Sequence, residues 1–457
     1  MGFGRRTFLQ LAGVGAVGLT GHDWSRLRLD GRLVLPGDAD YDRVRLPFNL
    51  VYSGNKPAAV ALCAGEADVA RCLEFAARNR IPVAARGGKH SYAGYSTPAD
   101  GLVVDLSALN RAQVSGDRVV VGGGMRLREL YEELGAAGRL LPAGTCATVG
   151  IGGLALGGGI SVVGRRHGLT CDRLRAARVV TPDGVVRRVA ADADEDLFWA
   201  LRGGGGGNFG VVTSFEFETS PAGDLVVFSL SFPAGSAVDV LGAWQEWFAS
   251  APDELWTACE VRAGSPTPVS IAGTWSGPET GLTPWLNRLA ARVRPTRRQV
   301  RVLSHLVAMR YFAGCEVSCP PVRGASFVAS SRFLAKPADP AKVVALLTGK
   351  RAGWAQFDSF GGTIGRVPVT ATAFPHRDAF ASMQAYVDVG LVDQAEARRT
   401  VAALRDGIGG GTGYVNYIDP DMPDWATSYY GPNLPRLREV AARYDPDRVL
   451  AFAQGVR

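Results

Sequence analysis

Two glycine-rich stretches in the N-terminal half carry the residues most able to do chemistry. Residues 86–92 read R-G-G-K-H-S-Y and contain His90, and residues 144–153 read G-T-C-A-T-V-G-I-G-G and contain Cys146. Glycines in such a loop bring backbone N–H groups close to an anion, but no Gly-Lys-Ser/Thr follows at the spacing of a P-loop. Taken alone, His90 also fits a buried structural histidine, and a lone cysteine is usually an inert core residue.

The surroundings of Cys146 favour a functional role. Seven glycines lie between residues 144 and 159, without the Ser or Asn typical of a linker, and this pattern indicates tightly packed backbone. Cys146 therefore stands where side-chain bulk is otherwise avoided.

A third glycine run, residues 202–210, reads R-G-G-G-G-G-N-F-G, and its end formally matches G-x-G-x-x-G. A helix is expected before this loop and a strand after it. That order is the reverse of the one that places a pyrophosphate on a helix N-terminus. We therefore reject a nicotinamide dinucleotide site and expect the run to let the backbone pass against a flat or charged part of a cofactor.

The C-terminal segment is rich in aromatic residues, including Tyr414, Tyr417, Trp425, Tyr429 and Tyr430. If Tyr414 and Tyr417 lie on a regular strand, their odd separation places them on opposite faces. One could then face the core and the other a pocket. Core packing explains most of the other tyrosines.

The order of these motifs resembles the berberine bridge enzyme-like oxidases of the p-cresol methylhydroxylase and vanillyl-alcohol oxidase flavoprotein superfamily. The resemblance rests on R-G-G-K-H-S, G-T-C-A-T-V-G-I-G-G, R-G-G-G-G-G-N-F-G-V-V-T, Y-V-N-Y-I-D, Y-Y-G-x-N and Y-D-P. It covers roughly residues 40–457. Lys89 stands where the family frequently has glycine, a minor change if the backbone supplies the contacts.

The resemblance implies a bicovalent FAD, attached to His90 at the flavin 8α-methyl and to Cys146 at flavin C6. Tyr417 matches the general base of the family. The reaction implied is removal of a substrate proton by Tyr417 and hydride transfer to flavin N5, followed by reoxidation by dioxygen to hydrogen peroxide. Further cofactor contacts are expected from Arg86, Gly87, Gly88, Lys89, Ser91, Thr148, Val149, Gly150, Gly153, Gly159, Gly210, Val212 and Asn433.

Several points stay open at this stage. A tyrosine has an ordinary pKa near ~10, so a base role requires a group that favours its phenolate, and the sequence does not show which one. The substrate could be an alcohol, a sugar or a secondary metabolite. The resemblance also implies that a small side chain at Val149, three residues after Cys146, admits oxygen, which favours an oxidase over a dehydrogenase that uses another electron acceptor. An exported flavin-fold binding protein without turnover is the non-enzymatic alternative.

Hydrophobic periodicity and turn residues predict the elements that position these motifs. Strands are expected at 58–62, 81–85, 101–106, 118–121, 211–218, 225–232 and 269–275, a hairpin at 175–189, and helices at 66–79, 127–138, 194–201, 237–249 and 340–347. The fold class expected is α+β. Residues 40–220 form a two-subdomain FAD-binding domain of the p-cresol methylhydroxylase type, residues 221–410 a substrate domain with an antiparallel sheet, and residues 411–457 a C-terminal segment that returns to the FAD domain.

Composition excludes several other classes. The 457 residues are 47% hydrophobic and 20% charged, which is ordinary for a soluble globular protein and not for a disordered chain. The net charge is +7, and most of the basic residues are arginines. Their densest run, residues 292–301, is interpreted as a solvated helix end and loop, not a nucleic-acid site. Seven scattered cysteines show neither a disulfide framework nor zinc-site spacing, so no metal is expected. Oligomeric state is left open.

The N-terminus resembles a twin-arginine export signal, which defines residues 1–25 as a leader. Arg5 and Arg6 precede the apolar stretch 8–19, and 12 residues are too few to span a bilayer as a helix. No stable membrane insertion is expected. This route exports folded proteins, which suits an enzyme that takes up its cofactor before leaving the cytoplasm. No clean cleavage site is visible.

We predict that changing Arg5→Lys together with Arg6→Lys blocks export and leaves active enzyme in the cytoplasm. Lysine keeps the charge, so a general basic leader would tolerate the change, whereas a receptor for paired arginines would not. The measurement is activity in cytoplasmic and extracellular fractions. Unchanged extracellular activity would contradict this export route.

Overall fold

The computed structural model describes residues 22–316 and 323–456, so Arg5, Arg6 and most of the expected leader lie outside the described residues. A four-stranded sheet opens the fold, with strands in the order β1 (Arg32–Val34), β2 (Ala59–Leu62), β4 (Leu102–Asp105) and β3 (Val83–Arg86). The last three are parallel and β1 is antiparallel. The short helices here are η1 (Trp24–Arg26), α1 (Tyr41–Arg45) and η2 (Leu50–Tyr52). Because β1 pairs with β2, the first subdomain includes residues before the boundary expected at residue 40.

Helix α2 (Glu66–Asn79) follows β2 and packs on this sheet. Its buried stripe, Val69, Cys72, Leu73 and Ala76, has the spacing of one helix face. The helix stops at Arg80, which adopts a left-handed conformation with φ of 54°. The chain then enters β3, which leads directly into the His90 loop.

A second, five-stranded antiparallel sheet has the order β5 (Ala112–Ser115), β6 (Arg118–Gly122), β10 (Val211–Glu218), β8 (Leu174–Val180) and β9 (Val186–Ala190). Its connections hold α3 (Leu127–Ala136), α4 (Ile151–Leu156), α5 (Gly164–His167), η3 (Thr170–Arg173) and α6 (Glu195–Ala200). A two-stranded ribbon of β7 (Arg139–Leu140) and β11 (Ser220–Pro221) lies beside it. The expected order at the third glycine run is confirmed, since α6 precedes it and β10 follows.

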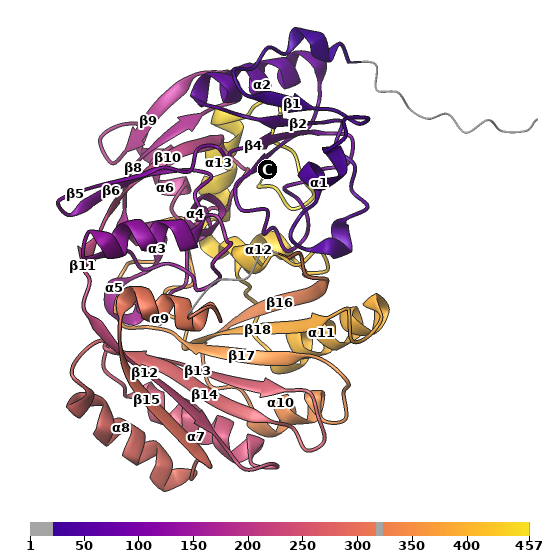
Figure 1. The fold of residues 1–457 in the computed structure, drawn as a ribbon. Helices are drawn as coiled ribbons and strands as arrows, with labels where there is room; N and C mark the ends of the chain where they lie inside the picture. Colours follow the sequence, from indigo (N-terminus) through magenta and orange to yellow (C-terminus); the bar gives the residue numbers. More distant parts are fainter. Residues whose placement is uncertain (1–21, 317–322, 457) are drawn as a thin grey trace, which may run out of the picture.

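The third sheet is antiparallel and seven-stranded and lies below the first two in Figure 1. Its order is β15 (Arg297–Ser304), β12 (Asp224–Ser231), β14 (Val269–Trp275), β13 (Leu255–Arg262), β17 (Trp354–Ser359), β18 (Ala381–Asp388) and β16 (Phe327–Leu334). One face packs in a hydrophobic core against α7 (Ala237–Ala249), α8 (Glu279–Arg292), α10 (Pro340–Leu347) and α11 (Gln394–Ile408). Helix α9 (His305–Phe312) contacts α3 of the upper part. The other face of the sheet, on which α9 packs against β12 and β15, is turned toward the first two sheets (Figure 1).

The C-terminal segment returns to the upper part of the molecule, where it is drawn in yellow in Figure 1. It contains η4 (Val415–Tyr417), α12 (Trp425–Tyr430), η5 (Gly431–Asn433) and α13 (Leu434–Tyr444). The Val83 backbone N–H donates to the Val449 carbonyl at 3.0 Å. The end of the chain therefore completes the sheet that contains β3.

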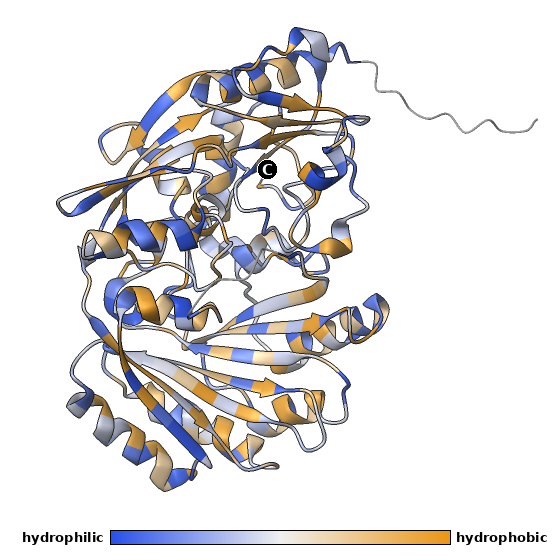
Figure 2. Ribbon diagram, viewed as in Figure 1, coloured by the Kyte–Doolittle hydropathy of each residue, from blue (hydrophilic) through white to orange (hydrophobic). Residues whose placement is uncertain are grey.

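The arginine-rich run between residues 292 and 301 differs from its expected structure. It comprises the end of α8 and then β15, an edge strand of the large sheet, instead of a helix end and a loop. Figure 2 shows β15 as a largely hydrophilic strand. Exposed charges on an edge strand oppose pairing with a strand of another molecule, which gives this run a structural role.

Within residues 22–316 and 323–456, no helix is both long and apolar enough to cross a membrane. The same part of the chain contains no group of three or more His, Cys, Asp or Glu side chains arranged to hold a metal ion.

Candidate active site

A cavity of about 830 Å³ lies between the large sheet, on its face opposite α7, α8, α10 and α11, and the glycine-rich loops of the upper part. Loops that follow β3 and β7 form one part of its wall, and residues of η4 approach from the C-terminal segment. Segments far apart in the sequence thus meet around one space.

The two glycine-rich stretches touch each other at the cavity wall. A Cβ atom on Gly88 would collide with the backbone nitrogen of Gly150, and a Cβ on Gly150 would collide with that of Gly88. Glycine is therefore required at both positions by this close approach, and His90 and Cys146 are brought to the same cavity.

The backbone N–H groups of residues 87–91 donate no hydrogen bond to any described residue. Gly153, in the first turn of α4, also has open space where a side chain would stand. Unpaired N–H groups along a glycine loop suit a bound anion such as a pyrophosphate.

His90 is held in a defined orientation. Its Nε2 atom lies 2.7 Å from the Thr148 hydroxyl oxygen, and its ring stacks on Phe48 with centroids 3.8 Å apart. Burial, with a smaller contribution from Arg126, lowers the pKa of His90 to about 4. The imidazole is therefore neutral near pH 7, and its Nδ1 atom is not bonded to any described residue.

Cys146 is a free cysteine whose side chain is open to the cavity. The thiol nevertheless lies deep in the protein, and desolvation raises its pKa. Cys315 also lines the cavity but is disulfide-bonded. Among the described residues, Cys146 is the one free thiol in the cavity wall.

Most of the other expected cofactor contacts lie in the cavity wall: Gly87, Gly88, Lys89, Ser91, Thr148, Val149, Gly150, Gly153, Gly210 and Val212. The side chain of Arg86 is an exception. Its guanidinium is fully buried against Asp105, with Nε 2.8 Å from the carboxylate, and its other donors reach backbone carbonyls and Thr97. Arg86 thus fixes the base of the loop instead of reaching into the cavity.

Two of the expected contacts lie elsewhere. Gly159 is not in the cavity wall, because it packs against Thr170. Asn433 is buried outside the cavity, and its amide donates to the carbonyl oxygens of Val369 and Thr372. Both residues support neighbouring segments in this geometry, and a contact of either with the cofactor stays a prediction.

The expected strand at Tyr414 and Tyr417 is also wrong. The chain forms the 3₁₀ turn η4 there, in which residues three apart lie on the same side. The two rings meet edge to face with centroids 5.0 Å apart. The Tyr414 hydroxyl accepts hydrogen bonds from the backbone N–H groups of Gly159 at 2.7 Å and Ile160 at 3.3 Å, and from the Asn416 amide at 2.9 Å.

Tyr417 lines the cavity and stacks on Tyr92, with centroids 5.2 Å apart. Its hydroxyl makes no hydrogen bond to any described residue. Burial raises the pKa of Tyr417 well above its ordinary value, and nearby Tyr92 and Asp358 raise it further. The protein by itself therefore keeps this phenol protonated near pH 7.

The large sheet contributes residues that the sequence reasoning missed. On β17, Trp354, Gln356 and Asp358 alternate along one face and line the cavity, as do Gln384 and Tyr386 on β18. Alternation of large polar and aromatic residues in an otherwise apolar strand is the signal that could have identified this face.

Asp358 is a buried carboxyl group in this face. It accepts hydrogen bonds from the Gln356 amide at 2.9 Å and the Ser382 hydroxyl at 3.3 Å. Burial raises its pKa to about 6. On β18, the Gln384 amide donates to the Tyr92 hydroxyl at 2.6 Å, which links the sheet to the His90 loop.

Comparison with known proteins identifies the class. Residues 57–190 match the FAD binding domain family, and residues 413–457 match the berberine and berberine-like family. The chain is 32% identical to an uncharacterized FAD-linked oxidoreductase of Bacillus subtilis over 94% of this chain and 98% of that protein. It is 31% identical to the chitooligosaccharide oxidase of Gibberella zeae, over 91% of this chain and 88% of that protein.

The protein therefore belongs to the berberine bridge enzyme-like FAD-linked oxidoreductases, and the predicted family, fold class and enzymatic nature are confirmed. A solved structure of glucooligosaccharide oxidase from Acremonium strictum, described with a 6-S-cysteinyl, 8α-N1-histidyl FAD, has a TM-score of 0.84 and 26% identity. That match covers 94% of this chain and 97% of the other.

Three observations show that the cavity fits FAD. The unpaired N–H groups of residues 87–91 suit the pyrophosphate, and Gly153 leaves room beside them. Buried polar atoms of the cavity wall also lack partners among the described residues, including the Ser96 hydroxyl and the indole N–H of Trp256. Such groups are costly to bury unless a ligand pairs with them.

We predict that Gly88→Ala separates the two loops and lowers the free energy of unfolding by about 1–3 kcal/mol, the usual cost of overpacking. The added methyl group would collide with backbone, which cannot move aside as a flexible side chain would. Thermal unfolding and the flavin content of the purified protein are the measurements. Gly54→Ala is the control, since nothing lies within 4 Å of its added Cβ; equal behaviour of the two variants would contradict the prediction.

Proposed function

We propose that this protein is an exported oxidase with a bicovalent FAD, which oxidises a hydroxyl-bearing carbon of a carbohydrate and passes the electrons to dioxygen. The observation that carries the proposal is the convergence of His90, Cys146 and Tyr417 on one cavity. Membership of the family supports FAD as the cofactor. The convergence of the three residues supports His90 and Cys146 as its attachment sites and Tyr417 as the base.

His90 and Cys146 are the proposed attachment residues. The Thr148 hydroxyl occupies Nε2 of His90, which leaves Nδ1, the N1 position of imidazole, for the bond to FAD. Cys146 is open to the same cavity in a second loop. Two bonds from separate loops would retain the cofactor in an open site and after export.

When bound, the FAD would accept a hydride at N5 and deliver the electrons to dioxygen, giving hydrogen peroxide. Tyr417 is the proposed base that takes the proton of the substrate hydroxyl. Because burial raises the pKa of Tyr417, its phenolate is a strong base but a minor form. Proton transfer is therefore favoured only when substrate and cofactor are in place.

A carbohydrate substrate is supported by the sheet face opposite the loops. Trp354 and Tyr386 stack with centroids 5.0 Å apart, and Gln356 and Gln384 present amide groups beside them. Flat aromatic surfaces and amides suit the apolar faces and hydroxyl groups of sugar rings. The oxidases of chitooligosaccharides and glucooligosaccharides among the similar proteins agree with this class. A dehydrogenase with another electron acceptor is the second candidate, favoured if reduced flavin reacts slowly with oxygen.

The domain division proposed follows the sheets: the FAD-binding domain up to about residue 220, the substrate domain to about 410, and the returning C-terminal segment. Export by the twin-arginine route is also part of the proposal. It is supported by Arg5, Arg6 and the apolar stretch 8–19 that follows them in the sequence.

A direct test combines spectroscopy with a substrate screen. The purified protein should be yellow, and its colour should stay with the protein after acid precipitation. Mono- and oligosaccharides and alcohols are then screened for hydrogen peroxide release in air. Flavin that is reduced anaerobically without peroxide release in air would favour the dehydrogenase, and colourless protein would contradict the proposal.

We predict that His90→Ala and Cys146→Ala each leave a singly attached flavin, and that the double variant leaves flavin that can be extracted. The physical reason is that each residue stands in a different loop at the same cavity. Mass spectrometry of flavin-bearing peptides is the measurement. Flavin on neither peptide of the parent protein would overturn the bicovalent assignment.

We predict that Tyr417→Phe slows anaerobic flavin reduction by ~10²–10⁴-fold, the usual contribution of a general base. Because the pKa of Tyr417 is raised, the parent rate should rise with pH up to that pKa, by about tenfold per pH unit. The variant should lose this rise. Stopped-flow reduction between pH 6 and 9 measures both effects.

Tyr414→Phe is unsuitable as a control, because the Tyr414 hydroxyl accepts three hydrogen bonds. Tyr41→Phe is better matched, since its buried hydroxyl donates to the Pro57 carbonyl and neither residue lines the cavity. That variant should lose about 1 kcal/mol of stability and reduce flavin normally. A Tyr417→Phe rate equal to that of Tyr41→Phe would exclude Tyr417 as the base.

A further inference from the structure

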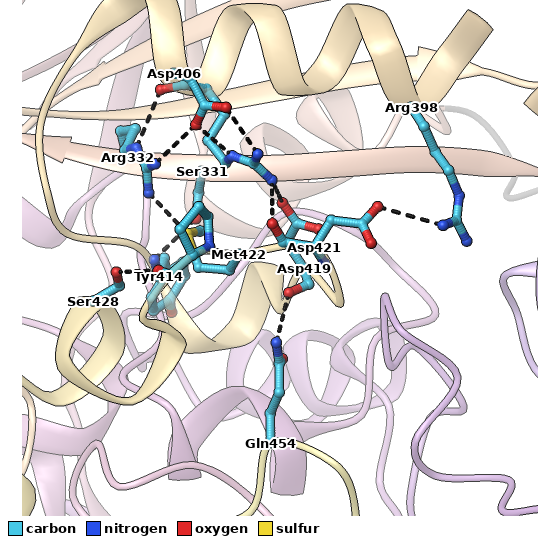
Figure 3. A network of polar contacts seen from close by, with 12 residues as sticks. Ser331, Arg332, Arg398, Asp406, Tyr414, Asp419, Asp421, Met422, Ser428 and Gln454 are labelled. Atoms are coloured by element: carbon cyan, nitrogen blue, oxygen red, sulfur yellow. Dashed lines mark hydrogen bonds and ion pairs between the residues drawn. The ribbon is translucent and has the colours of Figure 1, made fainter. Parts of the chain in front are cut away.

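An ionic network that is buried at Arg332, Arg405 and Asp419 and exposed at Asp406 joins the large sheet to the C-terminal segment (Figure 3). Arg332 projects from β16, and Arg405 and Asp406 lie at the end of α11. Asp419 follows the 3₁₀ turn that carries Tyr417. The two arginines and two aspartates balance in charge, and three separate parts of the chain meet in the network.

The contact between Arg405 and Asp419 is the most buried in this network. Arg405 Nη1 lies 2.8 Å from Asp419 Oδ2 and donates to the Asp421 carbonyl at 2.7 Å, and the two charged side chains are 6% and 3% exposed. The other edge of the guanidinium holds Asp406 through two hydrogen bonds. Arg405 therefore has little freedom to move.

Asp419 in turn fixes the backbone around it. Its Oδ1 accepts the N–H of Asp421, its own N–H donates to the Tyr429 hydroxyl, and its carbonyl accepts the Gln454 amide, each at 2.8 Å. Every one of these contacts lies within the C-terminal segment. Three contacts tie this turn to α11, which packs on β16 and β18: the ion pair of Arg405 with Asp419, the hydrogen bond from Arg405 to the Asp421 carbonyl, and the exposed ion pair of Arg398 with Asp421.

Tyr417 has no polar anchor of its own. Its hydroxyl bonds to none of the described residues, and its ring is held by packing on Tyr92 and Tyr414. On its N-terminal side the turn is fixed at two residues: the Tyr414 N–H donates to the Ser331 hydroxyl of β16, and the Asn416 amide donates to the Leu154 carbonyl, each at 2.9 Å. On its C-terminal side the fixed point is Asp419, two residues after Tyr417. The position of the phenol thus depends on anchors at both ends of the turn.

We propose that Arg405 is a positioning residue for Tyr417. It acts through Asp419 and sets the place of the phenol relative to the cavity face of β17 and β18. The proposal rests on the proposed role of Tyr417 as the base. A displacement of about 1 Å at a reacting group can cost ~10²-fold in rate, so a small shift of the turn would be visible in catalysis.

The test compares Arg405→Met, Arg405→Lys and Asp419→Asn with the parent holoenzyme. Arg405→Met should lower the limiting rate of anaerobic flavin reduction by ~10–100-fold, while the apparent dissociation constant of the substrate stays within about threefold, because the sheet face is untouched. Arg405→Lys should restore part of the rate. Amide hydrogen exchange should rise in peptides spanning residues 413–422.

Asp68→Asn is the matched control. Asp68 is a fully buried carboxylate that accepts the N–H groups of Asp30, Gly31 and Ala64 at 2.8–2.9 Å, far from Tyr417. It should lose stability without change in the reduction rate. If Arg405→Met behaves as this control does, Arg405 is structural only and the proposal is overturned.

Two further outcomes keep the test decisive. If Arg405→Met does not fold, the isosteric Asp419→Asn variant carries the same prediction, and a normal reduction rate in that variant overturns the proposal. If Tyr417→Phe reduces flavin at the parent rate, the proposed base is wrong. Faster hydrogen exchange at residues 413–422 in Arg405→Met would in that case still show that Arg405 holds the turn, and unchanged exchange would refute both.

Discussion

The close contact between Gly88 and Gly150 is the constraint on which the site depends. Neither position has room for a Cβ atom, because each faces the backbone of the other. This contact joins the loop after β3 to the loop before α4. Without it, His90 would lose its partner Thr148, and Cys146 would not share a cavity wall with the histidine.

Burial is the second general feature of the cavity, and it favours the neutral form of each reactive group. It lowers the pKa of His90 and raises the pKa values of Cys146 and Tyr417. All three are therefore neutral near pH 7 before any ligand binds. The cavity wall stabilises none of their charged forms, so the bound cofactor and substrate would have to stabilise them.

The local hydrophobic pattern of the sequence was sufficient to predict many helices and strands. Helix α2 and strand β10 have the bounds that periodicity predicted, because each shows one buried face at its own repeat. The segment at Tyr417 was interpreted as a strand with its two tyrosines on opposite faces, whereas the structure has a 3₁₀ turn there. What holds it in a turn is contact with distant residues, Ser331 and Gly159 among them.

By itself, the sequence determined the family motifs, the order of helices and strands, and the identities of His90, Cys146 and Tyr417 as candidates. Only the tertiary structure decided that Arg86 supports its loop through Asp105, that Asn433 lies outside the cavity, and that Asp358 lies near Tyr417. The physical reason is that motifs record short-range spacing. Which side chains share a buried space depends on contacts between strands and loops that are tens to hundreds of residues apart in the sequence.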